Sequence, residues 1–197
     1  MHVVVAPVFG TNCTVVSAPG GDCVVVDAGA GVADAVVAHV RSAGLVPRAV
    51  LATHGHVDHT WDAAALADRF GVPVVLHAAD AYRLADPFGS LEHGGPAASR
   101  PGAGVAGPRR AAGAPGHTEA PTRHLVGEPG AGLVLSGDVL FAGSVGRTDL
   151  PGGDGATMAR TLRDVVAHLD PAWDVLPGHG PATTVARELV TNPFLAR

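Results

Sequence analysis

Residues 49–60, AVLATHGHVDHT, are the stretch that decides the fold of this chain. Its apolar first half predicts a buried strand that leads directly into a polar cluster. Side chains two positions apart on an extended segment point the same way, so His54 and His56 can reach one metal ion together. Once the chain turns into a helix, Asp58 and His59 can face a second ion. Three imidazoles and a carboxylate within six residues suit Zn²⁺ or another borderline ion.

The segments around this stretch alternate between strand-like and helix-like patterns, which predicts an α/β architecture. Val-rich runs bounded by Gly and Pro predict strands, and apolar residues three and four apart predict helices. The predicted strands are Val3–Val8, Thr14–Ser17, Cys23–Val26, Ala49–Thr53, Val74–His77, Leu133–Ser136, Val139–Ala142 and Asp174–Leu176. The predicted helices are Val32–Ala43, Thr60–Phe70, one that Asp154 caps and that ends near Pro171, and Ala182–Val190. Residues 86–116, rich in Gly, Ala and Pro, predict a long surface loop that is either filler or a substrate lid.

Three further residues follow Gly at predicted turns and are candidates to complete a site for two ions. They are His117 in PGHT, Asp138 in SGD and His179 in PGHG. Gly lets the backbone approach a cavity closely while the polar side chain stands at the end of a strand. Each residue alone is more typical of a turn, but together with the first cluster they predict metal ligands.

The ordered motifs HxHxDH, GH, GD and GHG resemble those of the metallo-β-lactamase superfamily. The stretches GSVGRTDLPGGD at 143–154, LPGHGPATTV at 176–185, and Glu188 with NPFL at 192–195 are similar to the short glyoxalase-II-like hydrolases of that superfamily. These motifs span nearly the whole chain. The resemblance implies one domain over 1–197, folded as a four-layer αβ/βα sandwich whose two similar halves surround one metal site.

The resemblance also implies a centre of two divalent metal ions. The ions are expected to be Zn²⁺, with Fe or Mn as alternatives. A bound Zn²⁺ lowers the pKa of water from about 15.7 to roughly 7, which makes hydroxide available at neutral pH to attack a carbonyl carbon. Asp58 is implied as the catalytic residue that orients this nucleophile. The implied ligands are His54, His56 and His117 for the first ion, Asp58, His59 and His179 for the second, and Asp138 as a bridge between them.

The function that these motifs imply is hydrolysis of a thioester, such as a hydroxyacyl-thiol conjugate. A thiol with a pKa of about 8.5 leaves readily as the thiolate, so the reaction needs little acid help. One alternative is a persulfide dioxygenase of the same fold with a single iron, which needs only two His and one Asp on its metal. Another alternative is a metallohydrolase that acts on a different ester or lactone. β-Lactam hydrolysis is less favoured, because GRTDLPGGD is not typical of those enzymes.

Departures from the family pattern bear on the substrate. The chain has no Lys, although glyoxalase II enzymes use basic residues for the carboxylates of glutathione. It is also expected to lack the C-terminal helical domain of the longer enzymes, so another small thiol is an alternative carrier. After the residues that match His117 and Thr118, many members of the family continue with Pro-Gly-Ser, whereas this chain has Glu119-Ala120-Pro121. Glu119 therefore either perturbs the metal site or faces solvent.

Residues outside the ligand set are weaker candidates. Arg147, in GRTD, can bind a substrate carboxylate through its guanidinium or form a salt bridge with Asp149. Asp27, at the end of a predicted strand, either orients the ligand loop by hydrogen bonds or is an ordinary turn residue. Cys13 and Cys23 are expected to be small buried apolar residues on adjacent strands rather than a redox pair.

Composition restricts the partners. The net charge is −5 and the 13 basic residues form no long run, which disfavours a nucleic-acid groove. No apolar run approaches the roughly 18 residues of a membrane span. The first ten residues, MHVVVAPVFG, lack the features of a secretory signal, so the protein is expected to be cytoplasmic with reduced thiols. The expected partner is a small-molecule substrate, not a nucleic acid or a membrane, and the oligomeric state is left open.

Overall fold

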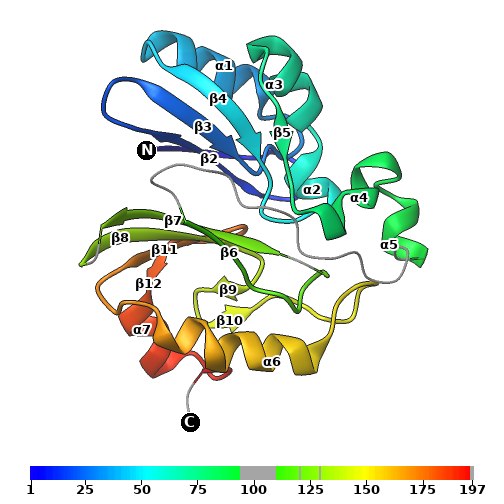
Figure 1. Cartoon of the computed structure of the whole chain (residues 1–197), viewed down its shortest axis with the longest axis vertical. Coiled ribbons are helices and arrows are strands. Elements are labelled where there is room, and N and C mark those ends of the chain that lie inside the picture. The colour runs from blue at the N-terminus through cyan, green and yellow to red at the C-terminus, as the bar shows by residue number, and fades with distance from the viewer. Residues whose placement is uncertain (94–109, 120, 129, 196–197) are drawn as a thin grey trace.

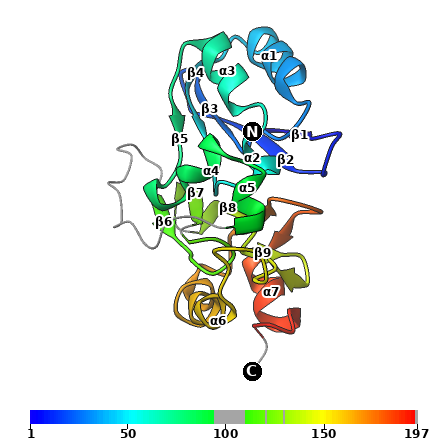
Figure 2. The same ribbon diagram turned by 90° about the vertical axis from the view of Figure 1, so that its right-hand side faces the viewer.

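The computed structural model describes residues 1–93, 110–119, 121–128 and 130–195. Two five-stranded sheets face each other, and helices cover the outer side of each sheet (Figure 1). A view turned by 90° shows the same stacking, with the N-terminal half above the C-terminal half (Figure 2). The layers run helix, sheet, sheet, helix, which confirms the predicted four-layer αβ/βα sandwich.

The N-terminal half forms the first sheet. Its strands and helices are β1 His2–Val5, β2 Asn12–Ser17, β3 Asp22–Val26, α1 Ala33–Ser42, β4 Val46–Leu51, α2 Val57–Thr60, α3 Ala63–Phe70, β5 Val74–Val75, η1 Ala78–Asp80, α4 Tyr82–Ala85 and α5 Gly89–His93. The strand order is β1-β2-β3-β4-β5, antiparallel from β1 to β3 and parallel from β3 to β5. Cys13 and Cys23 are buried in the neighbouring strands β2 and β3, as predicted.

The C-terminal half forms the second sheet. Its elements are β6 Arg110–Gly113, β7 Thr122–Glu128, β8 Ala131–Gly137, β9 Leu140–Phe141, β10 Ser144–Val145, α6 Gly155–Asp164, η2 Val166–His168, β11 Asp174–Pro177, β12 Thr183–Thr184 and α7 Val185–Thr191. The strand order is β12-β11-β8-β7-β6, with a parallel pair only between β8 and β11 among these described strands. The strands β9 and β10 pair with each other.

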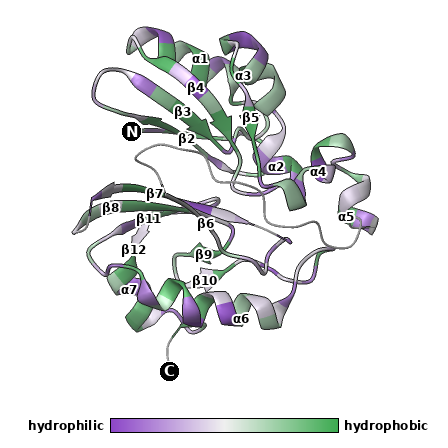
Figure 3. Ribbon diagram, in the orientation of Figure 1, coloured by the Kyte–Doolittle hydropathy of each residue, from purple (hydrophilic) through white to green (hydrophobic). Residues whose placement is uncertain are grey.

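Three apolar clusters fill the three interfaces between the layers. Successive side chains of a strand point to opposite faces, so Val25 of β3 packs under the outer helices while Val24 faces the second sheet. In β11, Val175 packs towards α6 and Leu176 towards the first sheet. Strands buried on both faces have continuous apolar sequences, and Figure 3 shows them largely green. No helix in the described part of the chain is both long and apolar enough to cross a bilayer.

The buried carboxylate of Glu188 fixes helix α7 in the second half. It accepts hydrogen bonds from the backbone N–H of Gly143 at 2.8 Å, the hydroxyl of Thr183 at 2.6 Å and the side-chain amide of Asn192 at 2.9 Å. Glu188 itself has no exposed surface. The residue therefore joins the turn before β10, strand β12 and the end of α7.

The prediction of an unstructured loop over 86–116 is wrong at both of its ends. Helix α5 occupies Gly89–His93 and strand β6 occupies Arg110–Gly113, while 94–109 lie outside the described residues. Strand β6 pairs with β7, which the sequence analysis also missed. Short strands of small and polar residues form here through pairing with a neighbour, and their own sequences hold no apolar alternation.

The helix predicted over Thr60–Phe70 begins earlier and is interrupted. Helix α2 already starts at Val57, and Trp61 and Asp62 separate it from α3. The carboxylate of Asp62 accepts two backbone N–H groups at the start of α1, at 3.0 and 2.9 Å. This attachment to another helix explains the break, which the local pattern does not show.

Smaller differences affect the ends of other elements. Strand β1 ends at Val5, because the chain turns through Phe9 and Gly10 with φ of 68° and 73°. The last helix begins three residues later than predicted, because β12 pairs with β11 first. The helix capped by Asp154 ends at Asp164 and continues as the 3-10 turn η2.

Asn12 ties the two halves together at one edge of the sandwich. Its backbone N–H donates to the carbonyl of Gly178 at 2.7 Å. Its side-chain amide donates to the carbonyls of Pro177 and Gly180, both at 2.9 Å. These contacts join β2 to the turn that follows β11, some 165 residues along the chain.

Candidate metal centre

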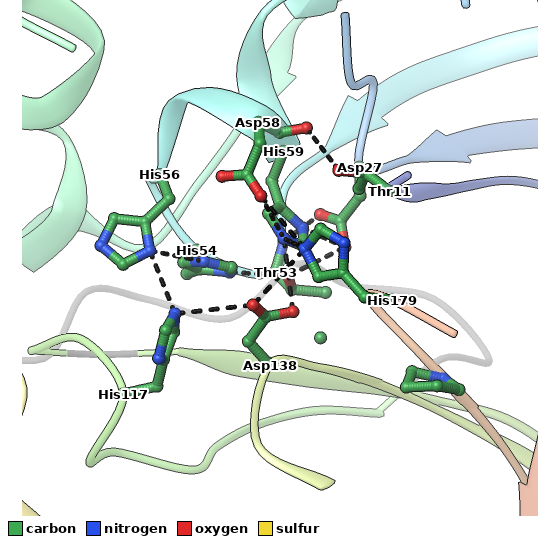
Figure 4. A network of polar contacts seen from close by, with 12 residues as sticks. Thr11, Asp27, Thr53, His54, His56, Asp58, His59, His117, Asp138 and His179 are labelled. Atoms are coloured by element: carbon green, nitrogen blue, oxygen red, sulfur yellow. Dashed lines mark hydrogen bonds and ion pairs between the residues drawn. The ribbon is translucent and has the colours of Figure 1, made fainter. Parts of the chain in front are cut away.

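All seven predicted ligands gather at the edge of the sandwich where Asn12 joins the halves (Figure 4). Four of them come from the loop after β4 and from α2, in the N-terminal half. The other three stand in separate turns of the C-terminal half: His117 between β6 and β7, Asp138 after β8, and His179 after β11. Each turn ends or precedes a strand of the second sheet, so the sheet itself brings the three residues to one edge.

The first group of candidate ligands is His54, His56 and His117. The Nδ1 atom of His56 lies 3.1 Å from Nε2 of His54 and 3.0 Å from Nε2 of His117. The three residues are 0%, 4% and 3% exposed, so water reaches this group poorly from outside. Three ring nitrogens thus face one point from two different halves of the molecule.

The second group is Asp58, His59 and His179. The Nε2 atom of His179 lies 3.1 Å from a carboxylate oxygen of Asp58 and 3.2 Å from Nε2 of His59. The side chains of Asp58 and His179 are 22% and 28% exposed, whereas that of His59 is completely buried. The second group therefore forms the open side of the centre.

Asp138 lies between the two groups. Its Oδ1 atom is 3.3 Å from Nε2 of His59, and its Oδ2 atom is 3.6 Å from Nε2 of His179. The same Oδ2 atom is 3.7 Å from Nε2 of His117 in the first group. The carboxylate of Asp138 therefore reaches ligands of both groups, and its role as a bridge between two ions stays a prediction.

Backbone carbonyls fix the orientation of two of the imidazoles. The Nδ1–H of His117 donates to the carbonyl of Arg147 at 2.6 Å, and that of His179 donates to the carbonyl of Phe9 at 3.2 Å. A donor on one ring nitrogen leaves a lone pair on the other, and that lone pair faces the centre. The surrounding backbone thus selects the tautomer that a metal ligand requires.

Asp27 does the same for the ligands of the N-terminal half. Its Oδ2 atom lies 3.1 Å from Nδ1 of His59 and accepts the hydroxyl of Thr53 at 2.9 Å. Thr53 in turn lies 3.1 Å from Nδ1 of His54, which donates to it, and its backbone N–H donates to Asp27 at 2.7 Å. Asp27 therefore contacts the back of one ligand directly and of another through Thr53, as expected for an orienting group rather than an ordinary turn residue.

The electrostatics keep the first group neutral. Burial and the neighbouring imidazoles lower the pKa of His54 well below its ordinary value. Burial lowers the pKa of His56 to about 3, with His117 and the Arg83 cation adding to the effect. Burial also lowers the pKa of His117, against the raising effect of Asp138. At neutral pH these rings offer lone pairs.

The electrostatics of the second group are dominated by carboxylates. Burial disfavours ionised Asp58, but its hydrogen bond to His179 and the charge of His59 outweigh burial and lower its pKa. Burial likewise disfavours ionised Asp138, and the charge of His59 lowers its pKa. Burial lowers the pKa of His59, but the charges of Asp138 and Asp27 outweigh burial and raise it. A hydrogen bond to Asp58 raises the pKa of His179. The ionised carboxylates of Asp58 and Asp138 thus favour a bound cation at the second group.

The donor set fits divalent metal ions. The Nδ1 atoms of His54 and His117 carry the ring protons, so the Nε2 atoms of both rings are acceptors. A proton on Nδ1 of His56 could be donated to only one of these two acceptors. The Nε2 atom of His56 is buried and has no hydrogen-bond partner among the described residues, so it is available to carry the ring's proton. Imidazole and carboxylate donors in these numbers suit Zn²⁺ or Fe.

Glycines leave the space in which the ligands meet. A Cβ atom on Gly178 would collide with Oδ1 of Asp138 and approach the ring of His59 at 2.6 Å. A Cβ on Gly137, which has φ of 51°, would lie 2.5 Å from the hydroxyl of Thr53. A residue larger than Gly does not fit directly before His179 or Asp138, because the backbone there lies too close to the ligands and to Thr53. The sequence patterns predicted this role of Gly at both turns.

The remaining candidates lie near the centre with different contacts. The guanidinium of Arg147 forms two hydrogen bonds of 2.7 Å with exposed Asp149, so the ion pair is the arrangement present and a substrate contact stays a prediction. Glu119 faces Tyr82 and Arg83 rather than the ligands. The sequence patterns did not indicate Thr53 or the carbonyl of Phe9 as part of the centre. Only the position of Thr53 directly before the HxHxDH cluster could have indicated its role.

Comparison with known proteins gives consistent matches. A sequence model described as the metallo-beta-lactamase superfamily matches residues 6–179. A hydroxyacylglutathione hydrolase of Anaeromyxobacter dehalogenans is 36% identical, over 92% of this chain and 67% of its own length. An uncharacterized protein of Mycobacterium tuberculosis is 35% identical, over 96% of this chain and 95% of its own. A probable metallo-hydrolase of Bacillus subtilis is 33% identical, over 88% and 87%.

Two solved structures are similar over their whole length. BLEG-1, described as a B3 metallo-beta-lactamase, has a TM-score of 0.84 and 29% identity, covering 100% of this chain and 99% of its own. TTHA1623, solved in a di-iron-bound form, has a TM-score of 0.84 and 31% identity, covering 99% of this chain and 100% of its own. The seven candidate ligands therefore lie within the part of the chain that these structures share.

Proposed function

Because the chain belongs to the metallo-beta-lactamase superfamily, whose members are generally metal-dependent hydrolases, we propose that it hydrolyses a thioester with two divalent metal ions. The proposed substrate is a hydroxyacyl-thiol conjugate. The observation that carries this proposal is the complete second group, in which Asp58, His59 and His179 meet beside the first group. An enzyme with one metal ion needs no such group.

The two groups divide the work of holding the ions. His54, His56 and His117 would hold the first ion, Asp58, His59 and His179 the second, and Asp138 would contact both. Ions bound there would supply a Lewis acid and lower the pKa of water into the neutral range. Zn²⁺ is the proposed ion, and Fe is the main alternative, since the similar TTHA1623 was solved with two irons.

Asp58 is the proposed catalytic residue. Its carboxylate is ionised at neutral pH, because the contacts to His179 and His59 lower its pKa. It lies on the open side of the centre, where a substrate can approach. An ionised carboxylate in this position accepts a hydrogen bond from the attacking water and orients its lone pair towards the carbonyl carbon.

The surrounding residues keep the ligands ready before a substrate arrives. Asp27 and the carbonyls of Arg147 and Phe9 hold the rings of His59, His117 and His179 in one tautomer. Preorganised groups need no rearrangement during the reaction, which is the main source of electrostatic catalysis. A thiolate leaves with little acid help, so the proposed reaction requires no proton donor on the leaving-group side.

The name of one relative supports a thioester as the proposed substrate. The similar protein of Anaeromyxobacter dehalogenans is named a hydroxyacylglutathione hydrolase and is 36% identical. A different thiol remains the alternative to glutathione, because the chain has no Lys for the glutathione carboxylates.

The test combines a metal count with one hydrolysis assay. Zn²⁺-loaded protein would be analysed for ions per chain and then given S-D-lactoylglutathione, with loss of thioester absorbance as the readout. Two ions with a kcat/KM of about 10⁴ M⁻¹s⁻¹ or more would support the proposal, since ordinary enzymes reach this value. One iron per chain with oxygen consumption on a persulfide would favour a dioxygenase. Two ions with turnover of a β-lactam or a lactone, and of no thioester, would refute the proposed substrate class.

A further inference from the structure

An ion pair between buried Arg83 and partly exposed Glu119 lies directly behind the first group of ligands. The guanidinium of Arg83, on α4, has no exposed surface and lies 2.7 Å from a carboxylate oxygen of Glu119. The other carboxylate oxygen accepts the hydroxyl of Tyr82 at 2.9 Å. Glu119 follows the ligand His117 by two positions, in the place where the sequence departs from the family pattern. We call Asp80, Tyr82, Arg83 and Glu119 the clasp.

Asp80 links the two loops that supply the first group. Its Oδ2 atom accepts the backbone N–H of Gly55 at 3.0 Å and the hydroxyl of Thr118 at 2.8 Å. Gly55 lies between His54 and His56, and Thr118 directly follows His117. One buried carboxylate oxygen thus sets the distance between ligand loops from different halves of the molecule.

Arg83 adds a third segment to this arrangement. It donates to the carbonyl of Pro151 at 2.8 Å, in the loop whose Arg147 carbonyl holds the ring of His117. Its side chain also packs on Gly55, where an added Cβ would lie 2.8 Å from Cδ of Arg83. Every segment that places a first-group ligand therefore touches the clasp.

The charges of the clasp also act on the first group. The Arg83 side chain lies against the ligand loop, since it packs on Gly55, between His54 and His56. A cation near a metal position opposes metal binding unless it is neutralised, and a buried arginine requires a partner. Glu119 supplies this neutralisation.

We infer that the clasp sets the affinity of the first group for its metal ion, with Asp80, Arg83 and Glu119 as positioning residues. The clasp holds His117 at the correct distance from His54 and His56 and cancels the Arg83 charge behind them. The second group is fixed by other contacts, from Asp27 to His59 and from Phe9 to His179. The inference rests on the proposed metal-dependent function, but it concerns metal binding and not the substrate.

The main test measures Zn²⁺ binding to metal-free protein in competition with a chelating dye. Glu119→Gln keeps the size of the side chain and removes its charge. It should weaken one of the two Zn²⁺ sites by about 10- to 100-fold, the usual cost of changing a group behind a metal ligand, and leave the affinity of the other site unchanged. Asp34→Asn, which breaks the exposed Arg69–Asp34 pair, is the matched control and should change neither site.

A second background identifies the affected ion. His56→Ala removes the first group and leaves one Zn²⁺ site. Adding Glu119→Gln to His56→Ala should not weaken that remaining site further. Equal weakening of both sites by Glu119→Gln, or weakening of the remaining site in the His56→Ala background, would overturn the inference, as would no change in either site.

Asp80 gives an independent test if Glu119→Gln does not fold. Asp80→Asn retains an oxygen that accepts both hydrogen bonds and should keep most of the first-site affinity, whereas Asp80→Ala should lose about 10- to 100-fold. Equal losses in the two variants would overturn the inference. The outcome is separable from the proposed function, because a protein that binds two ions and cleaves no thioester still allows every one of these measurements.

Discussion

The N-terminal half supplies four of the seven candidate ligands from six consecutive residues, 54–59, whereas the C-terminal half supplies three from separate turns, at 117, 138 and 179. In the first half, local geometry places the ligands, because one strand end and one short helix present all four. In the second half, the sheet places them, because the turns between its strands reach the same edge. The ligands of the N-terminal half therefore keep their arrangement when the distant fold changes. The positions of the three C-terminal ligands depend on how closely the strands approach one another.

The largest expected effect tests the compact cluster of the N-terminal half. Asp58→Ala removes the proposed catalytic carboxylate and one second-group ligand, so the rate of thioester hydrolysis should fall by about 10²- to 10⁴-fold. Steady-state kinetics, zinc content and circular dichroism would be measured together. The first Zn²⁺ site and the fold should persist. Asp164→Ala, at an exposed pair on α6, is the control, and a variant at Asp58 with more than a tenth of the normal rate would contradict the mechanism.

The next effect tests close approach in the C-terminal half. Gly178→Ala places a Cβ against Asp138 and His59, so it should lower zinc content and reduce the rate by about 100-fold, comparable to losing an electrostatic group in other enzymes. Gly180→Ala is the matched control, since its Cβ meets nothing within 4 Å. Its φ of 78° should cost about 1–2 kcal/mol of stability and little activity. Similar zinc contents in the two variants would show that the approach at Gly178 is not required.

A smaller effect sharpens the comparison by testing what supports the compact cluster. Asp27→Asn keeps the shape but places an amide where His59 and Thr53 need an acceptor. Zinc affinity should fall by about 10- to 100-fold, measured by chelator competition. Asp22→Asn, at the exposed start of strand β3, which ends just before Asp27, removes the charge that pairs with Arg48 and should leave affinity unchanged. Unchanged affinity in Asp27→Asn would mean that the backbone alone fixes the ligand loop.

The smallest effect on the centre is expected at Glu188, which supports the C-terminal half away from the ligands. Burial raises its pKa, but hydrogen bonds from Thr183, Gly143 and Asn192 outweigh burial and lower it. A carboxyl whose pKa is lowered by folding stabilises the protein above its unfolded pKa, about 4.5, and this contribution is lost as the pH falls through the folded value. Glu188→Gln should cost about 1–3 kcal/mol at pH 7 and less at acid pH.

Urea unfolding of the metal-free protein at pH 7 and near pH 3 would measure this difference. The zinc content of folded Glu188→Gln should equal that of the unaltered protein. A cost that is the same at both pH values would show that the charge of Glu188 contributes nothing, and a lost metal site would show that the two parts of the C-terminal half are coupled.

The sequence predicts the ligands of the N-terminal half better than it predicts how those of the C-terminal half come together. Strands buried on both faces are visible as apolar runs, and the HxHxDH cluster follows one of them within six residues. The turns at 117, 138 and 179 could be proposed as ligands because each follows a Gly, but their meeting point depends on the strand order. The αβ/βα layers followed from the resemblance, not from the periodicity alone.

Arg83 shows what could not be predicted. In HAADAYRLADP it looks like an exposed residue of a short helix, yet it is completely buried. Its partners are Glu119 and Pro151, which are 36 and 68 residues away. Strands β6 and β7 could not be predicted for the same reason, because they form by pairing with neighbouring strands. Such features depend on tertiary contacts between distant segments, which one sequence does not display.

The hydrogen bonds of Asn12 to the turn at 177–180 have a consequence for biosynthesis. His179 is made 120 residues after His59, an interval of about 6–24 s at ribosomal rates of roughly 5–20 residues per second. During that time the four ligands of the N-terminal half exist without the three of the C-terminal half. The second group gains its last ligand only when residues 177–180 dock beside β2, so the centre cannot be complete before the chain has been made as far as His179.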